Sequence, residues 1–114
     1  MIRIEEGNRR SLSYSVMEVS QIPEEMKELI EEKKESEFQI AYQKGMELFL
    51  TKGYGRQMSG GYSIQVEEVS ESENAVFCKT RLIGPSEDQA GSEPSYPCIV
   101  LKITDTSKPV QFMG

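Results

Sequence analysis

Hydrophobic residues recur at every second position over most of the chain, which is the period of a half-buried β-strand. Residues 98–101 are apolar at successive positions, so we expect the strand that contains them to be central and buried on both faces. Polar turns separate the strands, among them Gln43-Lys44-Gly45 and Glu71–Asn74. The predicted strands are residues 12–19, 38–42, 46–50, 62–66, 75–83 and 96–103, and residues 110–112 are a candidate for a short last strand.

One segment near the N-terminus has the spacing of a helix instead. Ile22, Met26 and Ile30 recur at helical intervals, and Leu29 widens the apolar stripe. Pro23 suits the first position of a helix, and the glutamates that follow it suit the positive end of the helix dipole. We therefore predict an amphipathic helix that turns a narrow apolar stripe inward and an acidic face to solvent.

The order of these segments predicts the fold class. One strand, one helix and then about five strands joined by short loops are typical of an α+β domain. We expect a curled, mostly antiparallel sheet of about six strands, sandwich-like or barrel-like, with the amphipathic helix after the first strand. A chain of 114 residues has the size of one domain. Residues 1–11 are mostly polar and charged, so we predict a flexible N-terminal lead-in there and a single domain over residues 12–114.

The charge balance argues against a nucleic-acid partner. The chain carries 13 Lys and Arg against 19 Asp and Glu, a net charge of -6, whereas affinity for nucleic acid comes mostly from Lys and Arg. No segment approaches the roughly 18 apolar residues of a spanning helix, so no membrane span is expected. The N-terminus has no signal peptide as written, which predicts a cytoplasmic protein; an exported or cell-envelope location is the alternative if the N-terminus is trimmed.

Candidate catalytic chemistry is sparse. The absence of histidine removes the commonest general base and the commonest metal ligand. Cys78 and Cys98 are too few for a four-ligand zinc site, and both fall in apolar strand segments. They are either buried thiols or a cross-strand disulfide. We therefore expect no catalytic residue, no cofactor and no metal site, and we predict that the protein is not an enzyme.

The glycine-rich segment Gly53–Gly61 is the main candidate for a functional loop. A phosphate-binding loop needs a helix after its glycines, whereas residues 62–66 have a strand pattern. We therefore expect these glycines to serve a tight turn or a β-bulge with positive φ. Tyrosines flank this loop and the irregular segment Gly84–Ser95, where they either anchor a partner protein or plug the ends of the sheet. The predicted partner-binding residues are Tyr54, Gly55, Arg56, Gly60, Gly61, Tyr62, Tyr96 and Pro97.

Two motifs carry a resemblance to a known family. The first places glycines and a small residue before a tyrosine, and the second joins Tyr-Pro to an aliphatic strand. The matching residues are Gly55, Ser59, Gly60, Gly61, Tyr62, Ser63 and Ile64, then Tyr96, Pro97, Ile99 and Val100. From about Tyr14 to Phe112 the chain resembles the PrcB C-terminal-like family, whose name comes from an accessory subunit of a bacterial surface protease complex. Cys98 departs from the pattern, because an aromatic residue is common at that position.

The resemblance implies a short, stand-alone bacterial member with a PrcB-like domain. We expect a non-catalytic protein-binding or accessory module that stabilises a partner such as a bacterial protease or an envelope protein. The alternative is a small-ligand or cell-wall-fragment binding domain, with Tyr54, Tyr62 and Arg56 around a shallow pocket. An exposed sheet edge is a further candidate for binding, so the protein is expected to be a monomer or an edge-strand dimer.

Overall fold

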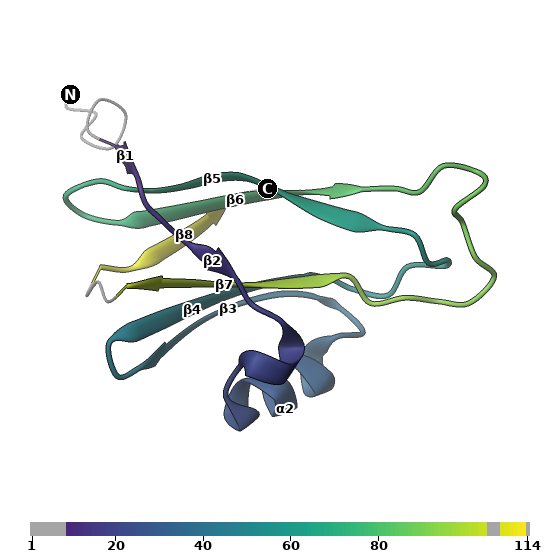
Figure 1. Cartoon of the computed structure of the whole chain (residues 1–114), viewed down its shortest axis with the longest axis horizontal. Helices are drawn as coiled ribbons and strands as arrows, with labels where there is room; N and C mark the ends of the chain where they lie inside the picture. Colours follow the sequence, from purple (N-terminus) through teal and green to yellow (C-terminus); the bar gives the residue numbers. More distant parts are fainter. Residues whose placement is uncertain (1–8, 105–107, 114) are drawn as a thin grey trace.

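Two β-sheets and one α-helix are stacked as three layers in the computed structural model of the chain (Figure 1). The structure describes residues 9–104 and 108–113. Each sheet has four strands. The helix, α2 (Glu24–Lys33), follows a 3-10 turn, η1 (Val19–Gln21), and lies on the outer side of one sheet.

The sheet farther from the helix is named here the β5–β6 sheet. Its strands are β1 (Arg10–Ser11), β5 (Ser63–Glu71), β6 (Val76–Ile83) and β8 (Val110–Met113), in the order β1-β5-β6-β8. β1 and β6 pair with β5 in antiparallel sense, whereas β8 pairs with β6 in parallel sense. A β-bulge interrupts the β5–β6 register between Val66 and Glu68.

The sheet next to the helix is named the β4–β7 sheet. Its strands are β2 (Ser15–Val16), β7 (Cys98–Thr104), β4 (Glu47–Tyr54) and β3 (Glu37–Lys44), in the order β2-β7-β4-β3. All pairs in this sheet are antiparallel. A two-residue turn joins β3 to β4, and its first residue, Gly45, has a φ of 61°, which matches the glycine-first hairpin turn that follows the twist of the strands.

Helix α2 covers the outer face of the β4–β7 sheet. Pro23 immediately precedes the helix, and Met26 is fully buried at 0% exposure. Met26 and Ile22 pack with Phe49 of β4 and Val100 of β7. The predicted amphipathic helix is therefore confirmed, because its apolar stripe is the surface that contacts the sheet.

The main hydrophobic core lies between the two sheets. Successive residues of a strand point to opposite faces, so β7 directs Leu101 into this core and Val100 toward the helix. This arrangement explains why residues 98–101 are apolar at successive positions, and it confirms that their strand is central. The buried members of the core are Leu48, Leu50, Val69, Val76, Cys78, Leu101 and Ile103.

The strand arrangement differs from the expected one. Eight strands are described instead of about six, they form two sheets instead of one curled sheet, and neither sheet closes into a barrel. Residues 12–19 are not one strand, because the chain crosses from one sheet to the other between Ser11 and Ser15 and packs Leu12 against the core. The combination of one helix with mostly antiparallel strands is confirmed for the described residues.

The predicted lead-in overlaps the first strand. Arg10 and Ser11 fall inside residues 1–11, yet they form β1 and pair with Glu71 and Ser70. Residues 1–8 of the lead-in lie outside the described residues. The single domain over residues 12–114 remains a prediction.

Candidate functional site

Two loops lie side by side at one end of the molecule (Figure 1). Residues 55–62 join β4 to β5 and residues 84–97 join β6 to β7; together they are named the loop pair. Gln57 and Ser95 exchange two backbone hydrogen bonds of 2.8 and 3.0 Å. The Ser95 hydroxyl also donates to the Ser59 carbonyl oxygen at 2.6 Å, and the Tyr54 N–H donates to the Pro97 carbonyl oxygen at 3.0 Å. The loops therefore form one bonded surface.

Two glycines of the loop pair are required by backbone geometry. Gly55 has a φ of 78° and Gly61 a φ of 86°, in the region that L-residues rarely adopt. A Cβ at Gly55 would lie 3.0 Å from the Glu37 amide nitrogen, and one at Gly61 would lie 2.7 Å from the Gln89 carbonyl oxygen. The expected turn with positive φ is confirmed at these positions. It is wrong for Gly53, which lies within β4, and for Gly60, because neither has a positive φ. A Cβ at Gly60 would meet nothing within 4 Å.

Contacts within the chain occupy two of the predicted tyrosines, and both are half-buried. The Tyr54 hydroxyl shares a hydrogen bond of 2.6 Å with the Thr80 hydroxyl of the facing sheet. The Lys34 ammonium lies 4.8 Å from the centre of the Tyr96 ring. These contacts favour the interpretation that Tyr54 and Tyr96 close the ends of the sheets.

The side chains expected around a ligand pocket do not share one hollow. Tyr62 lines a hollow of about 220 Å³ with Pro97 and Cys98. Tyr54 lines a separate hollow of about 300 Å³ beside β6, and Arg56 lines neither. Ligand pockets usually enclose about 300–1,000 Å³ and bury most of the ligand. The hollow at Tyr62 falls short of that range.

Two exposed side chains project from the loop pair. Arg56 is exposed, and its N–H donates to the Glu35 carbonyl oxygen at 3.2 Å, which fixes its backbone. Met58 is 80% exposed and is not among the residues predicted from the sequence. The signal that points to Met58 is an apolar residue inside a polar, glycine-rich run. Arg and Met are both enriched at protein interfaces, so these side chains suit contact with a partner.

Both cysteines are free thiols, so the disulfide alternative is wrong. Cys78 belongs to the core between the sheets, whereas the alternation along β7 turns Cys98 to the helix side. Burial raises the pKa of each thiol to about 11. Since the thiolate is the reactive form of cysteine, neither side chain suits nucleophilic chemistry at neutral pH.

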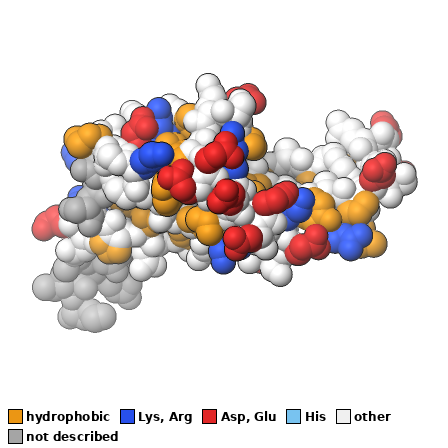
Figure 2. Space-filling model, turned by 90° about the horizontal axis from the view of Figure 1, so that it is seen from below, with side chains coloured by type: hydrophobic (Ala, Val, Ile, Leu, Met, Phe, Trp, Pro, Cys, Tyr) orange, Lys and Arg blue, Asp and Glu red, His pale blue; other side chains and the backbone are white. Residues whose placement is uncertain are grey.

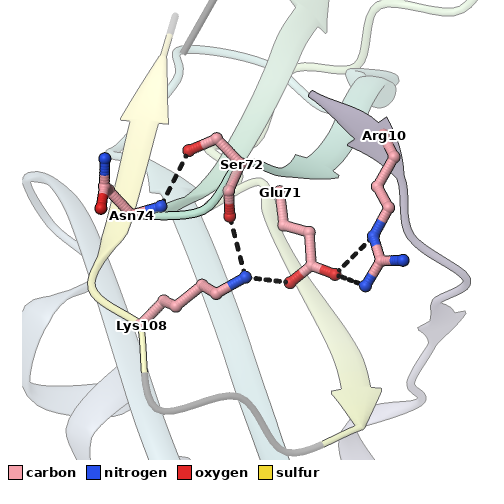
Figure 3. A network of polar contacts seen from close by, with 5 residues as sticks. All are labelled: Arg10, Glu71, Ser72, Asn74 and Lys108. Carbon is pink, nitrogen blue, oxygen red and sulfur yellow. Dashed lines mark hydrogen bonds and ion pairs between the residues drawn. The ribbon is translucent and has the colours of Figure 1, made fainter. Parts of the chain in front are cut away.

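A polar cluster centred on Glu71 lies at the other end of the β5–β6 hairpin (Figure 3). Glu71 is 7% exposed, and its carboxylate accepts from Arg10 Nε at 2.9 Å and from Lys108 Nζ at 3.0 Å. Lys108 also donates to the Ser72 carbonyl oxygen at 2.8 Å. Glu71 is the last residue of β5 and is therefore not part of the expected polar turn. Its side chain links β1 to the segment before β8 (Figure 3).

Glu71 is expected to make stability depend on acid. Lys108 and Arg10 hold the pKa of its carboxyl below the usual value. A carboxyl with a lowered folded-state pKa stabilises the fold above its unfolded-state pKa of about 4.3, and this contribution is lost as pH falls through the folded-state value. The melting temperature should therefore drop less between pH 6 and pH 3 in Glu71→Gln than in the unmodified protein.

The matched control is Glu73→Gln, because Glu73 is exposed and lies two residues away. Its melting temperature should follow the pH profile of the unmodified protein. Superimposable profiles for all three proteins would show that the Glu71 cluster contributes nothing to acid sensitivity.

A buried lysine was also missed by the sequence analysis. Lys52 of β4 is only 6% exposed, and its ammonium donates to the Glu37 carboxylate at 2.6 Å. It lies 5.1 Å from the centre of the Tyr54 ring. The signal for an inward-facing cation is that Lys52 directly follows the mostly apolar segment Leu48–Thr51. The ion pair joins β3 to β4 and neutralises the carboxylate on this face of β3.

Within residues 9–104 and 108–113, none of the helices has the length and apolar character of a membrane span. In the same part of the chain, no group of three or more His, Cys, Asp or Glu side chains is placed to hold a metal ion.

Residues 48–104 match the family model described as PrcB C-terminal, a segment that runs from β4 to β7 and includes the loop pair. No curated protein and no solved structure matches the chain.

Proposed function

The chain belongs to the PrcB C-terminal family, and on that premise we propose that it is a non-catalytic module that binds and stabilises a partner protein. The family is named after an accessory subunit of a bacterial surface protease complex. A bacterial protease or another envelope protein is therefore the first candidate partner. The observation that supports this proposal most directly is the loop pair, which presents Arg56 and Met58 on a backbone held by hydrogen bonds.

Preorganisation is the physical reason that the loop pair suits binding. A loop that is already ordered loses less conformational entropy when a partner docks. The Gln57–Ser95 bonds and the positive-φ glycines Gly55 and Gly61 supply that order. Among the other predicted residues, we assign direct contact to Arg56 alone. Support of the loops is assigned to Tyr54, Tyr62, Tyr96 and Pro97, and neither role is assigned to Gly60, where a Cβ would meet nothing within 4 Å.

Affinity capture of the tagged full chain from cytosolic and envelope fractions of its host tests the proposal. We expect a recurrent protein partner, and the fraction that contains it assigns the compartment. Met58→Glu should weaken capture at least about tenfold, since a buried charge at an interface centre is strongly unfavourable. Met46→Glu is the matched control, because Met46 is 70% exposed on the β3–β4 turn, away from the loop pair.

Two outcomes would contradict the proposal. An empty capture from both fractions would contradict the proposal that a partner protein exists. Equal capture by the unmodified protein and by Met58→Glu would show that the loop pair is not the contact surface. The small-ligand alternative then gains weight and is checked by thermal shift with sugars and peptides, where the hollow at Tyr62 is the place to expect an effect.

A further inference from the structure

Strand β3 is an open edge of the β4–β7 sheet. It pairs with β4 over all eight of its residues without a bulge, and no strand of the described residues lies on its other side. Natural edge strands are usually blunted by a proline, a bulge, a central lysine or very short length. The middle of β3, Gln39-Ile40-Ala41, has none of these features.

The geometry of the hairpin shows which backbone groups point outward. In a two-residue hairpin the flanking pair, here Lys44 and Glu47, is hydrogen-bonded, and bonded pairs then alternate along the strands. Residues 38, 40 and 42 therefore bond to β4, whereas Glu37, Gln39 and Ala41 turn their N–H and C=O groups to the open edge. This alternation also predicts that the Tyr54 N–H, opposite Glu37, points away from β3, and it does so because it donates to the Pro97 carbonyl oxygen.

The same three residues are exposed on the face that looks toward the other sheet. Glu37, Gln39 and Ala41 are all exposed, so the β5–β6 sheet does not cover β3. On this face Lys52 neutralises the Glu37 carboxylate at 2.6 Å. An additional strand would thus find room beside β3, and its side chains on this face would meet little net charge.

The helix side of the edge is acidic. Glu25, near the start of α2, accepts from the Tyr42 hydroxyl at 3.2 Å and lies 3.5 Å from the Lys44 ammonium, so the helix runs back along β3. Glu28 and Glu32 follow Glu25 on the same helical face, three and seven residues on. Both are exposed, and in the described part of the chain neither has an ion pair.

Carboxylates gather on the face of the molecule that carries α2 (Figure 2). A strand added beside β3 would direct every second side chain toward this face, because side chains alternate along a strand. Lys or Arg at those positions would be attracted by the exposed carboxylates of Glu28 and Glu32. A second copy of the chain is a poor occupant, since two copies paired through β3 would bring two acidic helices together, and the net charge of each is -6.

We propose that β3 accepts an extended segment of the partner protein as an additional strand, and that this segment carries Lys or Arg at alternate positions. The proposal rests on the proposed protein-binding function and names the second surface used for it. Outward N–H and C=O groups supply affinity that is independent of sequence, as in other cases of strand addition. The acidic helix selects basic segments.

Titration calorimetry of the full chain with synthetic peptides tests the proposal. The probe is a capped eight-residue peptide in which lysine alternates with valine, and the comparison peptide has glutamate in place of lysine. We expect the lysine peptide to bind at least about tenfold more tightly at low salt, with affinity falling as salt screens the charges. Glu28→Gln combined with Glu32→Gln should remove most of this difference.

Ala41→Pro tests the backbone contribution. Proline removes an outward N–H while the bonds of residues 40 and 42 to β4 remain, so the hairpin itself is expected to persist. We expect this variant to bind the lysine peptide at least about tenfold more weakly, whereas the control Ala41→Val, which keeps the N–H, should bind it like the unmodified protein. If Ala41→Pro does not fold, hydrogen exchange replaces it: the amides of Glu37, Gln39 and Ala41 should slow when the lysine peptide is added.

Several outcomes would overturn strand addition. These are no binding of the lysine peptide at millimolar concentration, equal binding of both peptides, unchanged binding by Ala41→Pro, or unchanged exchange at the three amides.

Sedimentation that shows a dimer of the unmodified protein, lost in Ala41→Pro, would assign the edge to a second copy. Capture of a lysate partner despite these results leaves the proposed function intact, whereas peptide binding without any captured partner overturns the proposed function alone.

Discussion

Replacing Met26 with alanine is expected to lower the free energy of unfolding by about 2–5 kcal/mol, the usual range for truncating a buried methionine. Met26 is 0% exposed and is the central contact of α2 with the β4–β7 sheet. Its loss would leave a cavity against Phe49 and Val100, because the rigid sheet below cannot move to fill the space. Denaturant unfolding followed by circular dichroism measures the change.

Met46→Ala is the matched control for Met26→Ala. The two substitutions remove the same atoms, but Met46 is 70% exposed. Its replacement should change the free energy of unfolding by less than about 0.5 kcal/mol, as is usual for surface positions. Equal effects at the two positions would mean that α2 is not packed on the sheet as described, and the acidic flank of β3 would then lose its support.

Replacing Gly61 with valine is expected to lower the free energy of unfolding by about 2–4 kcal/mol, since it combines a strained backbone with a steric clash. Gly61 has a φ of 86°, and a Cβ there would lie 2.7 Å from the Gln89 carbonyl oxygen and 2.8 Å from Pro85 Cβ. The backbone of residues 84–97 would have to move, so the loop pair would loosen. The same variant should bind the captured partner more weakly.

Gly60→Val is the matched control for Gly61→Val, because it adds the same side chain at a position without the positive φ and the steric clash. Gly60 is adjacent to Gly61, has no positive φ, and a Cβ there would meet nothing within 4 Å. We expect it to change the free energy of unfolding by less than about 1 kcal/mol. If Gly60→Val destabilised the protein as much as Gly61→Val, the strained turn at Gly61 would not be the feature that orders the loop pair.

Local patterns were sufficient for the helix and for the central strand. The spacing of Ile22, Met26 and Ile30 predicts α2, because a helix exposes one face every 3.6 residues whatever it packs against. The apolar run at residues 98–101 predicts burial on both faces, and β7 is indeed covered by the sandwich core and by the helix. In both cases the spacing of apolar residues along the sequence shows directly which faces of the element are buried.

The backbone geometry of the glycine-rich segment could be predicted from the sequence, whereas its contacts could not. The glycine-rich run predicted a strained turn, since positive φ is a property of the residue itself. The bond between Tyr54 and Thr80 joins two different sheets, and no local pattern specifies it. Likewise, the exposure of Met58 depends on which loop lies beside it, so the sequence offered only an apolar residue in a polar run.

The sequence by itself determined the kind of the main local elements: the amphipathic helix, the period-two strands and the glycine turns. Only the tertiary structure decided which strands are neighbours. Period-two alternation reports how a strand is buried on each face, yet it carries no information on the strand at its side. For this reason the division into two sheets, the pairing of Arg10 with Glu71, and the open edge of β3 became visible only in the folded chain.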